Sequence, residues 1–362
     1  MPPTEPAELP ALWLRDNCGC PECRDPRTGQ KLFQVNELPE KPSVETAELT
    51  AGAWEVVWAP DGHRSRYGAE WLTEAAAPDD RTEDAKDLWP TADALGGRLP
   101  ETTWAAYLEQ DGERVGMLDA VRRLGFCLLR EVPPHQDQVL EAAHSFGYVR
   151  ETNYGLRFGV RVEDEPNNLA FTNVRITPHT DNPYRDPVPT LQLLHCLVND
   201  AEGGDSGLVD GFAAAATLRE EQPDAFAALT RTPVPFVFRD AVTELRAERP
   251  LIGVDPRGRI NEVRFNNRSL GTLRRPADEV EAFYAGYRAF AELLLRPERQ
   301  LEFRLSPGDC LVFDNTRLLH ARTAFARGGA RHLQGCYADL DGLLSTLAVL
   351  RRRPENSMEA AR

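Results

Sequence analysis

Long apolar runs are missing from this 362-residue chain, and none approaches the roughly 20 residues that a membrane-spanning helix needs. The first residues, Met1-Pro-Pro-Thr-Glu-Pro6, also lack the basic segment followed by an apolar segment that marks a secretory leader. Repeats and low-complexity tracts are absent too, and 41% hydrophobic with 27% charged residues is ordinary for a globular protein. We therefore expect a cytoplasmic protein with no membrane partner.

Positive charge is scarce as well. The chain has 42 Lys and Arg against 57 Asp and Glu, which gives a net charge of -15 and a pI near 5.0. This balance opposes attraction to phosphate backbones and anionic lipids, so we expect no nucleic-acid partner. An anionic small molecule would need a local cationic anchor, which makes individual arginines informative.

The seven cysteines are unevenly placed. Four stand singly in apolar surroundings, as buried small hydrophobic residues do: Cys127, Cys196, Cys310 and Cys336. The other three are crowded into Cys18-Gly-Cys20-Pro-Glu-Cys23. A disulfide framework is not expected in a cytoplasmic chain of this length, so this cluster indicates metal binding.

Zinc is the metal that suits the cluster. Its three thiolates can occupy three corners of a tetrahedron, and His63, the only histidine of the N-terminal segment, can complete it. With four protein ligands the site would be closed to substrate, and its role would be to stabilise a small domain with little core. The alternative is three free thiols beside an exposed histidine.

Two domains are expected, a zinc-binding domain over residues 1–95 and a larger one over residues 96–362. In the first, short apolar runs such as Trp54-Glu-Val-Val-Trp58 alternate with turn-rich polar stretches, which predicts a small β-rich domain. The runs Ala11-Leu-Trp-Leu14 and Arg66-Tyr-Gly-Ala-Glu-Trp-Leu72 belong to this pattern. Between about residues 75 and 100 the hydrophobic periodicity disappears, as in an exposed connection.

The larger domain is predicted to be mainly β with flanking helices. A helical period runs through Leu118-Asp-Ala-Val-Arg-Arg-Leu124, and a strand follows at residues 125–130. Further strands are expected at residues 190–197, 207–211, 234–238, 262–266, 301–305, 310–314 and 332–339, and further helices at 213–221 and 277–295. Many short strands with irregular insertions favour a closed or double-sheet β architecture over alternating βαβ units.

His179 and Asp181 lie two residues apart, so on an extended strand their side chains leave the same face. His320 follows the apolar segment that begins at Cys310, and this segment could carry a third ligand to the first two. Two imidazoles and one carboxylate form the facial triad of non-haem iron(II) oxygenases, which leaves metal positions open. A chance His-x-Asp pair is the alternative interpretation.

Arg331 lies eleven residues beyond His320. If its segment is a strand, Arg331, Leu333, Gly335 and Tyr337 share one face. An arginine pairs bidentately with carboxylates, so Arg331 is a natural anchor for the distal carboxylate of 2-oxoglutarate. A solvated arginine on an edge strand is the alternative, since Arg317, Arg322 and Arg327 are nearby.

A series of short motifs runs in order along nearly the whole chain. They are Trp13-Leu-Arg-Asp-Asn-Cys-Gly-Cys-Pro-Glu-Cys23, Asn167-Asn168, His179-Thr-Asp181, Gln192-Leu-Leu-His-Cys196, Gly203-Gly-Asp-Ser206, Phe265-Asn-Asn267, Phe313-Asp-Asn315, Arg317-Leu-Leu-His320 and Arg331-His-Leu-Gln-Gly-Cys-Tyr337. Together they resemble the γ-butyrobetaine dioxygenase group of the taurine dioxygenase superfamily. The resemblance implies a distorted double-stranded β-helix, or jelly roll, and structural zinc in the N-terminal domain. It also implies a homodimer that uses Fe(II), 2-oxoglutarate and O2 to hydroxylate a small molecule, with release of succinate and CO2.

By this resemblance the site residues have definite roles. The iron ligands are His179, Asp181 and His320, the zinc ligands are Cys18, Cys20, Cys23 and His63, and the 2-oxoglutarate ligands are Arg331 and Ser206. The carboxylate of Asp181 fills a coordination position that related halogenases leave open for halide, so oxygenation is favoured over halogenation.

The resemblance also implies a substrate with a trimethylammonium group, caged by Tyr154, Phe158, Phe171 and Tyr337. Asn168 and Asn266 would bind the carboxylate of that substrate. The sequence departs from the betaine pattern at Asn182, where an aromatic residue is expected, and at Arg268, where a small one is expected. A guanidinium beside the anionic end suits a doubly charged head, so a trimethylaminoalkyl phosphonate is a candidate substrate beside γ-butyrobetaine.

Three other functions are compatible with parts of the sequence. The zinc cluster could belong to a non-catalytic binding module, which the acidic charge and the complete triad oppose. The metal site could catalyse redox-neutral lyase or isomerase chemistry. An oxygenase of the same type could also desaturate or rearrange its substrate rather than hydroxylate it.

Overall fold

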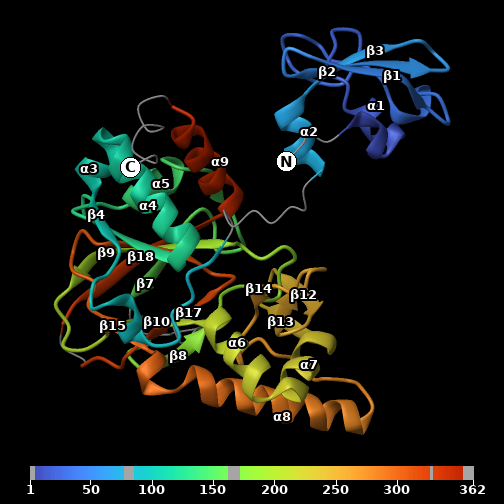
Figure 1. Cartoon of the computed structure of the whole chain (residues 1–362). Helices are drawn as coiled ribbons and strands as arrows, with labels where there is room; N and C mark the ends of the chain where they lie inside the picture. Colours follow the sequence, from blue (N-terminus) through green and yellow to red (C-terminus); the bar gives the residue numbers. More distant parts are fainter. Residues whose placement is uncertain (1–4, 77–84, 162–171, 327–328, 354–362) are drawn as a thin grey trace. The chain divides into compact units, whose positions relative to one another are not determined.

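The computed structural model describes residues 5–76, 85–161, 172–326 and 329–353. The chain divides into two compact units, Met1–Glu83 and Asp84–Arg362 (Figure 1). The division falls before residue 95 because Trp89 already belongs to the second unit. Trp89 is buried, its ring packs against Phe126, and its indole N–H donates to the carbonyl of Leu124 at 2.9 Å.

The first unit is a three-stranded antiparallel sheet of β1 (Ser43–Thr50), β2 (Ala53–Ala59) and β3 (Arg64–Gly68). Two helices complete it, α1 (Ala11–Asp16) and α2 (Ala69–Ala76). The β-rich prediction is confirmed for the sheet, but the apolar run at residues 11–14 is a helix. Pro10 precedes this helix, and the helix buries Leu14 against the aromatic core of the unit, an arrangement that a four-residue apolar run does not distinguish from a strand.

Two sheets form the body of the second unit. The larger sheet has the order β4-β5-β16-β9-β18-β6, and β7 also pairs with β18. The strands are β4 (Glu101–Thr103), β5 (Phe126–Arg130), β6 (Val149–Arg150), β7 (Phe158–Arg161), β9 (Leu191–Asn199), β16 (Cys310–Asp314) and β18 (Arg331–Ala338). The smaller sheet has the order β15-β10-β17-β8, with β8 (Ile176–His179), β10 (Ser206–Asp210), β15 (Leu301–Phe303) and β17 (Leu318–Arg322).

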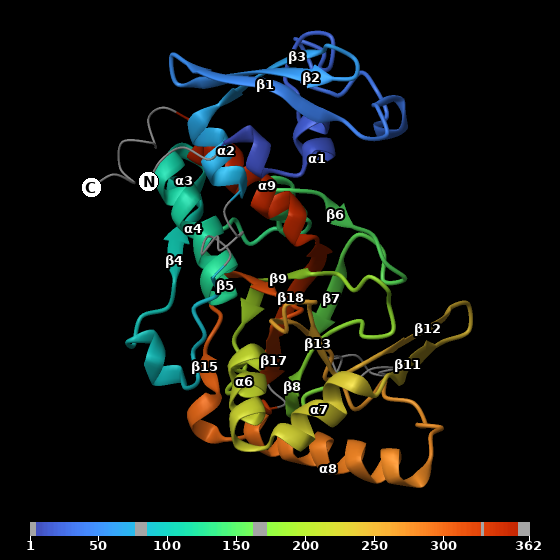
Figure 2. The same ribbon diagram turned by 45° about the vertical axis from the view of Figure 1, so that its right-hand side comes forward.

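Insertions between the strands carry the remaining elements. Two hairpins are formed by β11 (Val234–Arg239) with β12 (Glu244–Arg249) and by β13 (Ile252–Val254) with β14 (Ile260–Val263). The helices are α3 (Trp104–Glu109), α4 (Asp111–Leu124), α5 (Gln138–His144), α6 (Gly211–Glu221), α7 (Pro223–Arg231), α8 (Ala277–Leu294) and α9 (Leu340–Arg351). Helices α6, α7 and α8 gather at one end of the second unit, away from α3, α4 and α9 (Figures 1 and 2). No helix among the described residues is long and apolar enough to cross a membrane.

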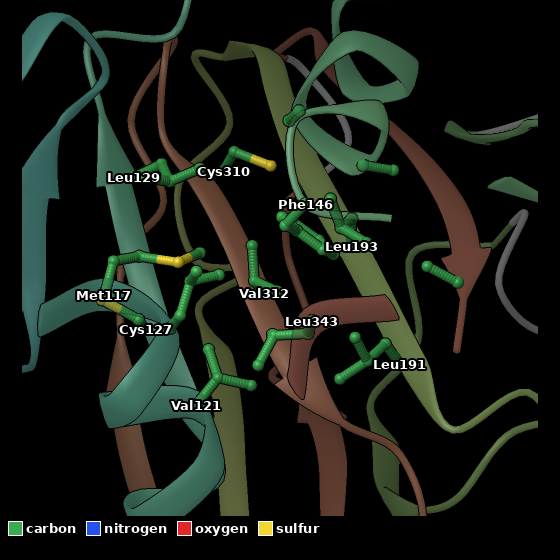
Figure 3. Packing of buried hydrophobic residues seen from close by; sticks show 14 of the residues in the cluster. Met117, Val121, Cys127, Leu129, Phe146, Leu191, Leu193, Cys310, Val312 and Leu343 are labelled. Carbon is green, nitrogen blue, oxygen red and sulfur yellow. The ribbon is translucent and has the colours of Figure 1, made fainter. Parts of the chain in front are cut away.

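Residues on the larger sheet alternate between two environments. In β9, Leu191 and Leu193 join the core beneath the helices, whereas Gln192 and Leu194 line a cavity. Figure 3 shows Met117 and Val121 of α4 packed with Leu191, Leu193 and Val312 of the sheet, and all five are buried. A second core lies between the two sheets and includes Phe313 of the larger sheet and Leu208 of the smaller one. This is the expected mainly β, double-sheet architecture with flanking helices.

The predicted strands agree with the structure where the apolar run is long. The strand expected at 310–314 is β16, and the helix expected at 277–295 is α8 with one residue fewer. The strand expected at 262–266 lies earlier, at Ile260–Val263, because the chain turns away to form the loop that carries Asn266 and Arg268. His320 lies on a strand of its own, β17, separated from β16 by the turn at residues 315–317.

A buried ion pair joins the ends of β10 and β17. The Arg317 guanidinium donates to both carboxylate oxygens of Asp210, at 3.2 and 2.7 Å, and both side chains have 0% exposure. Arg317 also donates to the carbonyls of Arg123 and Asp87, each at 2.7 Å. Asp210 accepts from the backbone N–H groups of residues 212 and 213 and so caps α6. Four chain segments therefore meet at one pair of charges.

Replacing Arg317 with Met is expected to lower the free energy of unfolding by about 3–5 kcal/mol, because it leaves a buried, uncompensated carboxylate. The measurement is urea denaturation of the whole chain, followed by circular dichroism. Arg288→Met is the control, since Arg288 forms an exposed pair with Glu292 on α8 and its loss should change stability little. Equal effects of the two substitutions would contradict the assignment.

Candidate active site

His179 ends β8, and His320 lies opposite it on the neighbouring antiparallel strand β17. Asp181 follows two residues later, so the three side chains converge. The His179 Nε2 atom is 3.5 Å from Asp181 Oδ1, and the His320 Nε2 atom is 3.8 Å from Asp181 Oδ2. One nitrogen or oxygen of each residue lies within 4.8 Å of the other two, which fits a single metal ion. The structure thus brings together the three predicted iron ligands.

Neighbouring groups orient these ligands. The Nδ1 atom of His179 lies 2.9 Å from the carbonyl of Thr177, which as an acceptor places the ring proton on Nδ1 and leaves Nε2 free for a metal. Asn315 holds the backbone of Asp181 on both sides: its Oδ1 accepts from the Asp181 N–H at 2.8 Å, and its Nδ2 donates to the Asp181 carbonyl at 3.0 Å. The hydroxyl of Tyr337 donates to Asp181 Oδ2 at 2.9 Å.

The protonation states of the triad suit a cation. Burial raises the pKa of Asp181, but the neighbouring imidazoles of His320 and His179 and the hydroxyl of Tyr337 outweigh this effect, so the pKa lies below its ordinary value. Removal from water and the neighbouring His179 lower the pKa of His320 to about 3. An ionised carboxylate and a neutral imidazole are the forms that bind a metal.

A second metal-ligating group lies in the first unit. The Nε2 atom of His63 is 3.4 Å from the sulfur of Cys18 and 3.5 Å from those of Cys20 and Cys23. Zinc bond lengths give a sulfur-to-nitrogen edge of about 3.6 Å in a tetrahedron, so the spacing fits zinc. The four side chains would fill all four positions of a tetrahedral zinc ion, which is the pattern of a structural zinc site.

A cavity of about 500 Å³ lies between the two sheets beside the triad. Arg331 and Ser206, the two residues predicted to bind 2-oxoglutarate, both line it. Arg331 is only 7% exposed, and the described residues offer its guanidinium neither a carboxylate within 4 Å nor a partner for its Nε. Removal from water lowers the pKa of this guanidinium. Because a buried, unpaired charge is costly, the cavity is suited to an anionic cosubstrate at this end.

Aromatic rings form another wall of the cavity. The Phe158 ring lies 5.1 Å from that of Tyr337 and 6.4 Å from that of Tyr154. Phe158 lies on Gly335, where an added Cβ would come within 2.4 Å of the ring. Tyr184 and Phe238 extend this wall, with ring centroids 5.1 Å apart, and the Tyr184 hydroxyl is 3.0 Å from that of Tyr154.

The sequence interpretation missed Tyr184 and Phe238. Tyr184 follows the metal-ligating segment by three residues, and Phe238 is contributed by the β11–β12 hairpin. Phe238 fell within an expected strand, but nothing in the sequence showed that this strand lines the cavity. Phe171 and Asn168, two of the predicted substrate residues, lie outside the described residues.

Polar groups line a third part of the cavity. Asn266 donates to the carbonyl of Thr180 at 2.9 Å and accepts from the backbone and guanidinium of Arg268, at 3.1 and 3.5 Å, so it shapes this loop. The remaining guanidinium nitrogens of Arg268 have no carboxylate within 4 Å among the described residues. Asn182 is 3% exposed, has a left-handed backbone with φ 55°, and neither of its amide atoms has a partner among the described residues.

The cavity between the two β-sheets combines a His/Asp/His metal triad with a buried arginine that has no carboxylate partner among the described residues. This combination is that of an iron- and 2-oxoglutarate-dependent oxygenase. The sequence profile described as "Taurine catabolism dioxygenase TauD, TfdA family" matches residues 90–337. The chain belongs to this family. A second profile, "Gamma-butyrobetaine hydroxylase-like, N-terminal", matches residues 3–73.

The relatives support this assignment over nearly the full length. The γ-butyrobetaine dioxygenase of Pseudomonas sp. (strain AK-1) is 37% identical, over 94% of this chain and 90% of the relative. The γ-butyrobetaine dioxygenase of Homo sapiens is 32% identical, over 97% and 93%. The trimethyllysine dioxygenase of Meyerozyma guilliermondii is 30% identical, over 95% and 90%.

One solved structure agrees in fold. An asparagine oxygenase in complex with Fe(II), 3-hydroxyasparagine and succinate aligns with a TM-score of 0.51 and 16% identity, over 63% of this chain and 80% of the other. At this identity the likeness concerns the fold alone, and it confirms the predicted double-sheet architecture.

Arg331→Met is expected to raise the dissociation constant for 2-oxoglutarate about 10- to 100-fold, because it removes a charge-assisted hydrogen-bond donor from a dry site. The measurement is anaerobic titration with Mn(II) in the metal site, with metal affinity measured separately. Arg304→Met is the matched control, since Arg304 donates to the carbonyls of Asn199 and Ala201. If the two variants bind 2-oxoglutarate equally well, Arg331 is not its anchor.

Proposed function

We propose that this protein hydroxylates a small trimethylammonium zwitterion in an Fe(II)- and 2-oxoglutarate-dependent reaction. The candidate substrates are a trimethylaminoalkyl phosphonate and γ-butyrobetaine. The observation that carries the proposal is the lining of one cavity, which combines a metal triad, the buried Arg331, an aromatic wall and the guanidinium of Arg268. The relatives named for γ-butyrobetaine and trimethyllysine dioxygenation support the same substrate class.

The proposal assigns a role to each group of cavity residues. His179, Asp181 and His320 hold Fe(II), and Arg331 with Ser206 holds the distal carboxylate of 2-oxoglutarate. With O2 and 2-oxoglutarate bound, the iron supplies the oxidising power that inserts oxygen into a C–H bond and releases succinate and CO2. The protein holds the target bond near the metal and keeps bulk water away from it.

The aromatic wall is the proposed binding site for the cation. A quaternary ammonium cannot donate hydrogen bonds, so its attraction to the faces of aromatic rings is the main recognition available to it. Tyr154, Phe158 and Tyr337 are the predicted cage residues that the structure describes, and each touches the next or lies near it. Tyr184 and Phe238 enlarge the same wall.

Arg268 is the proposed determinant of the anionic end. It lines the cavity, where removal from water lowers its pKa and the carboxylate of Asp181 raises it. Among the described residues its guanidinium bonds only to Asn266, through Nε, so its other nitrogens can present a fork of donors to a phosphonate or a carboxylate. Asn182, whose amide is also unpartnered among the described residues, adds a polar group where an aromatic residue would have narrowed the chamber.

Purified protein with Fe(II) and 2-oxoglutarate, offered each compound separately, tests the function. We expect one of the two compounds to cause succinate release and to give a product heavier by one oxygen atom.

A product lighter by two hydrogen atoms would indicate desaturation instead. His320→Ala is the inactive control. If neither compound causes succinate release, the trimethylammonium class is excluded. A homodimer, which is part of the proposal, is tested by light scattering on the same sample.

Arg268→Ala is expected to raise KM for the phosphonate about 10- to 100-fold, and KM for the carboxylate less, because the doubly charged head gains more from the guanidinium. The readout is the ratio of the two KM values. Arg239→Ala is the matched control, since Arg239 also lines the cavity but pairs with both carboxylate oxygens of Glu244. An unchanged ratio in Arg268→Ala would remove Arg268 from substrate recognition.

A further inference from the structure

We propose that Tyr337 is a positioning residue for the metal, which uses its hydroxyl to make Asp181 a ligand through one oxygen only. The cage role expected for Tyr337 concerns its ring, whereas this role concerns its hydroxyl. The proposal rests on the iron site and holds whichever substrate the protein uses.

The geometry assigns different partners to the two oxygens of Asp181. Oδ2 accepts the hydroxyl proton of Tyr337 at 2.9 Å. Among the described residues, no side chain donates a hydrogen bond to Oδ1. The Nε2 atom of His179 lies 3.5 Å away, but it carries no proton when Nδ1 donates to the carbonyl of Thr177, and so it is free for the metal. One lone pair of Oδ2 therefore accepts a hydrogen bond, whereas both lone pairs of Oδ1 remain for a metal, which favours Oδ1 as the ligating oxygen.

Both groups are held so that this bond persists. Tyr337 is buried, and its ring packs at 33° to that of Phe158. Asn315 fixes the backbone of Asp181 from the other side, and donates in addition to the carbonyl of Pro189 at 2.9 Å. Because Tyr337 belongs to the larger sheet and Asp181 follows a strand of the smaller sheet, the hydroxyl also links the two sheets across the cavity.

The consequence concerns the number of open metal positions. A six-coordinate metal held by the three protein ligands would have three positions left, of which 2-oxoglutarate would take two. A carboxylate that bound through both oxygens would take the last position, which O2 needs. A hydrogen bond to the outer oxygen of a ligating carboxylate opposes that second contact and fixes the direction of the first. The hydroxyl of Tyr337 thus keeps one position open.

Tyr337→Phe removes the hydroxyl and keeps the ring. We expect Fe(II) affinity to fall about 10- to 100-fold, as is typical when the partner of a metal ligand is lost. We also expect the visible charge-transfer band of the anaerobic complex with Fe(II) and 2-oxoglutarate to shift. Tyr154→Phe is the matched control, since its hydroxyl lies in the same cavity but bonds to Tyr184, and both quantities should keep their wild-type values.

A double-mutant comparison separates positioning from a general loss of structure. If Tyr337 acts through Asp181, then Tyr337→Phe should weaken Co(II) or Fe(II) binding in the wild-type background and change it little in an Asp181→Asn background. Equal losses in both backgrounds would overturn the proposal. Wild-type affinity and an unshifted band in Tyr337→Phe would overturn it as well.

Discussion

The buried ion pair between Arg317 and Asp210 is the contact on which the geometry of the second unit depends. It lies at the adjoining ends of β10 and β17, whose register sets Leu208 opposite His320 and Ser206 opposite Arg322. Since β17 also aligns His320 with His179 on β8, a shift of one residue would turn a metal ligand to the other face of the sheet. The pair fixes that register with two opposite charges that are both buried away from water.

The sequence predicted the site best where the two-residue periodicity of a strand was enough to place the side chains. The two-residue spacing of His179 and Asp181, and the shared parity of Arg331, Leu333 and Tyr337, each place side chains in one cavity, as observed. The Tyr337 hydroxyl bond to Asp181 joins residues 156 positions apart, and nothing local encodes it. Phe238 reaches the cavity through a hairpin insertion, whose docking depends on tertiary packing. The short run at residues 11–14 became a helix because four apolar residues satisfy either period.

Charged side chains of both signs line the cavity. The buried guanidinium of Arg331 has no carboxylate within 4 Å among the described residues, and the more exposed guanidinium of Arg268 lines the same cavity. The same cavity is lined by Asp181, a carboxylate whose pKa lies below its ordinary value and which is close to the imidazoles of His179 and His320. Two cationic side chains and a metal triad in one cavity suit a reaction in which two anionic molecules, cosubstrate and substrate, bind at once.

Gly335 shows how substrate range can change without any contact residue changing. Its missing Cβ leaves the space that the Phe158 ring occupies, and that ring in turn bounds the chamber. Any larger residue at position 335 would displace the Phe158 ring and so change the volume of the cavity, although residue 335 itself does not line it. Substitutions at position 335 can therefore change the size of the cation that a family member accepts, and a comparison of the lining residues alone would not detect them. Laboratory evolution for bulkier amines should include this position.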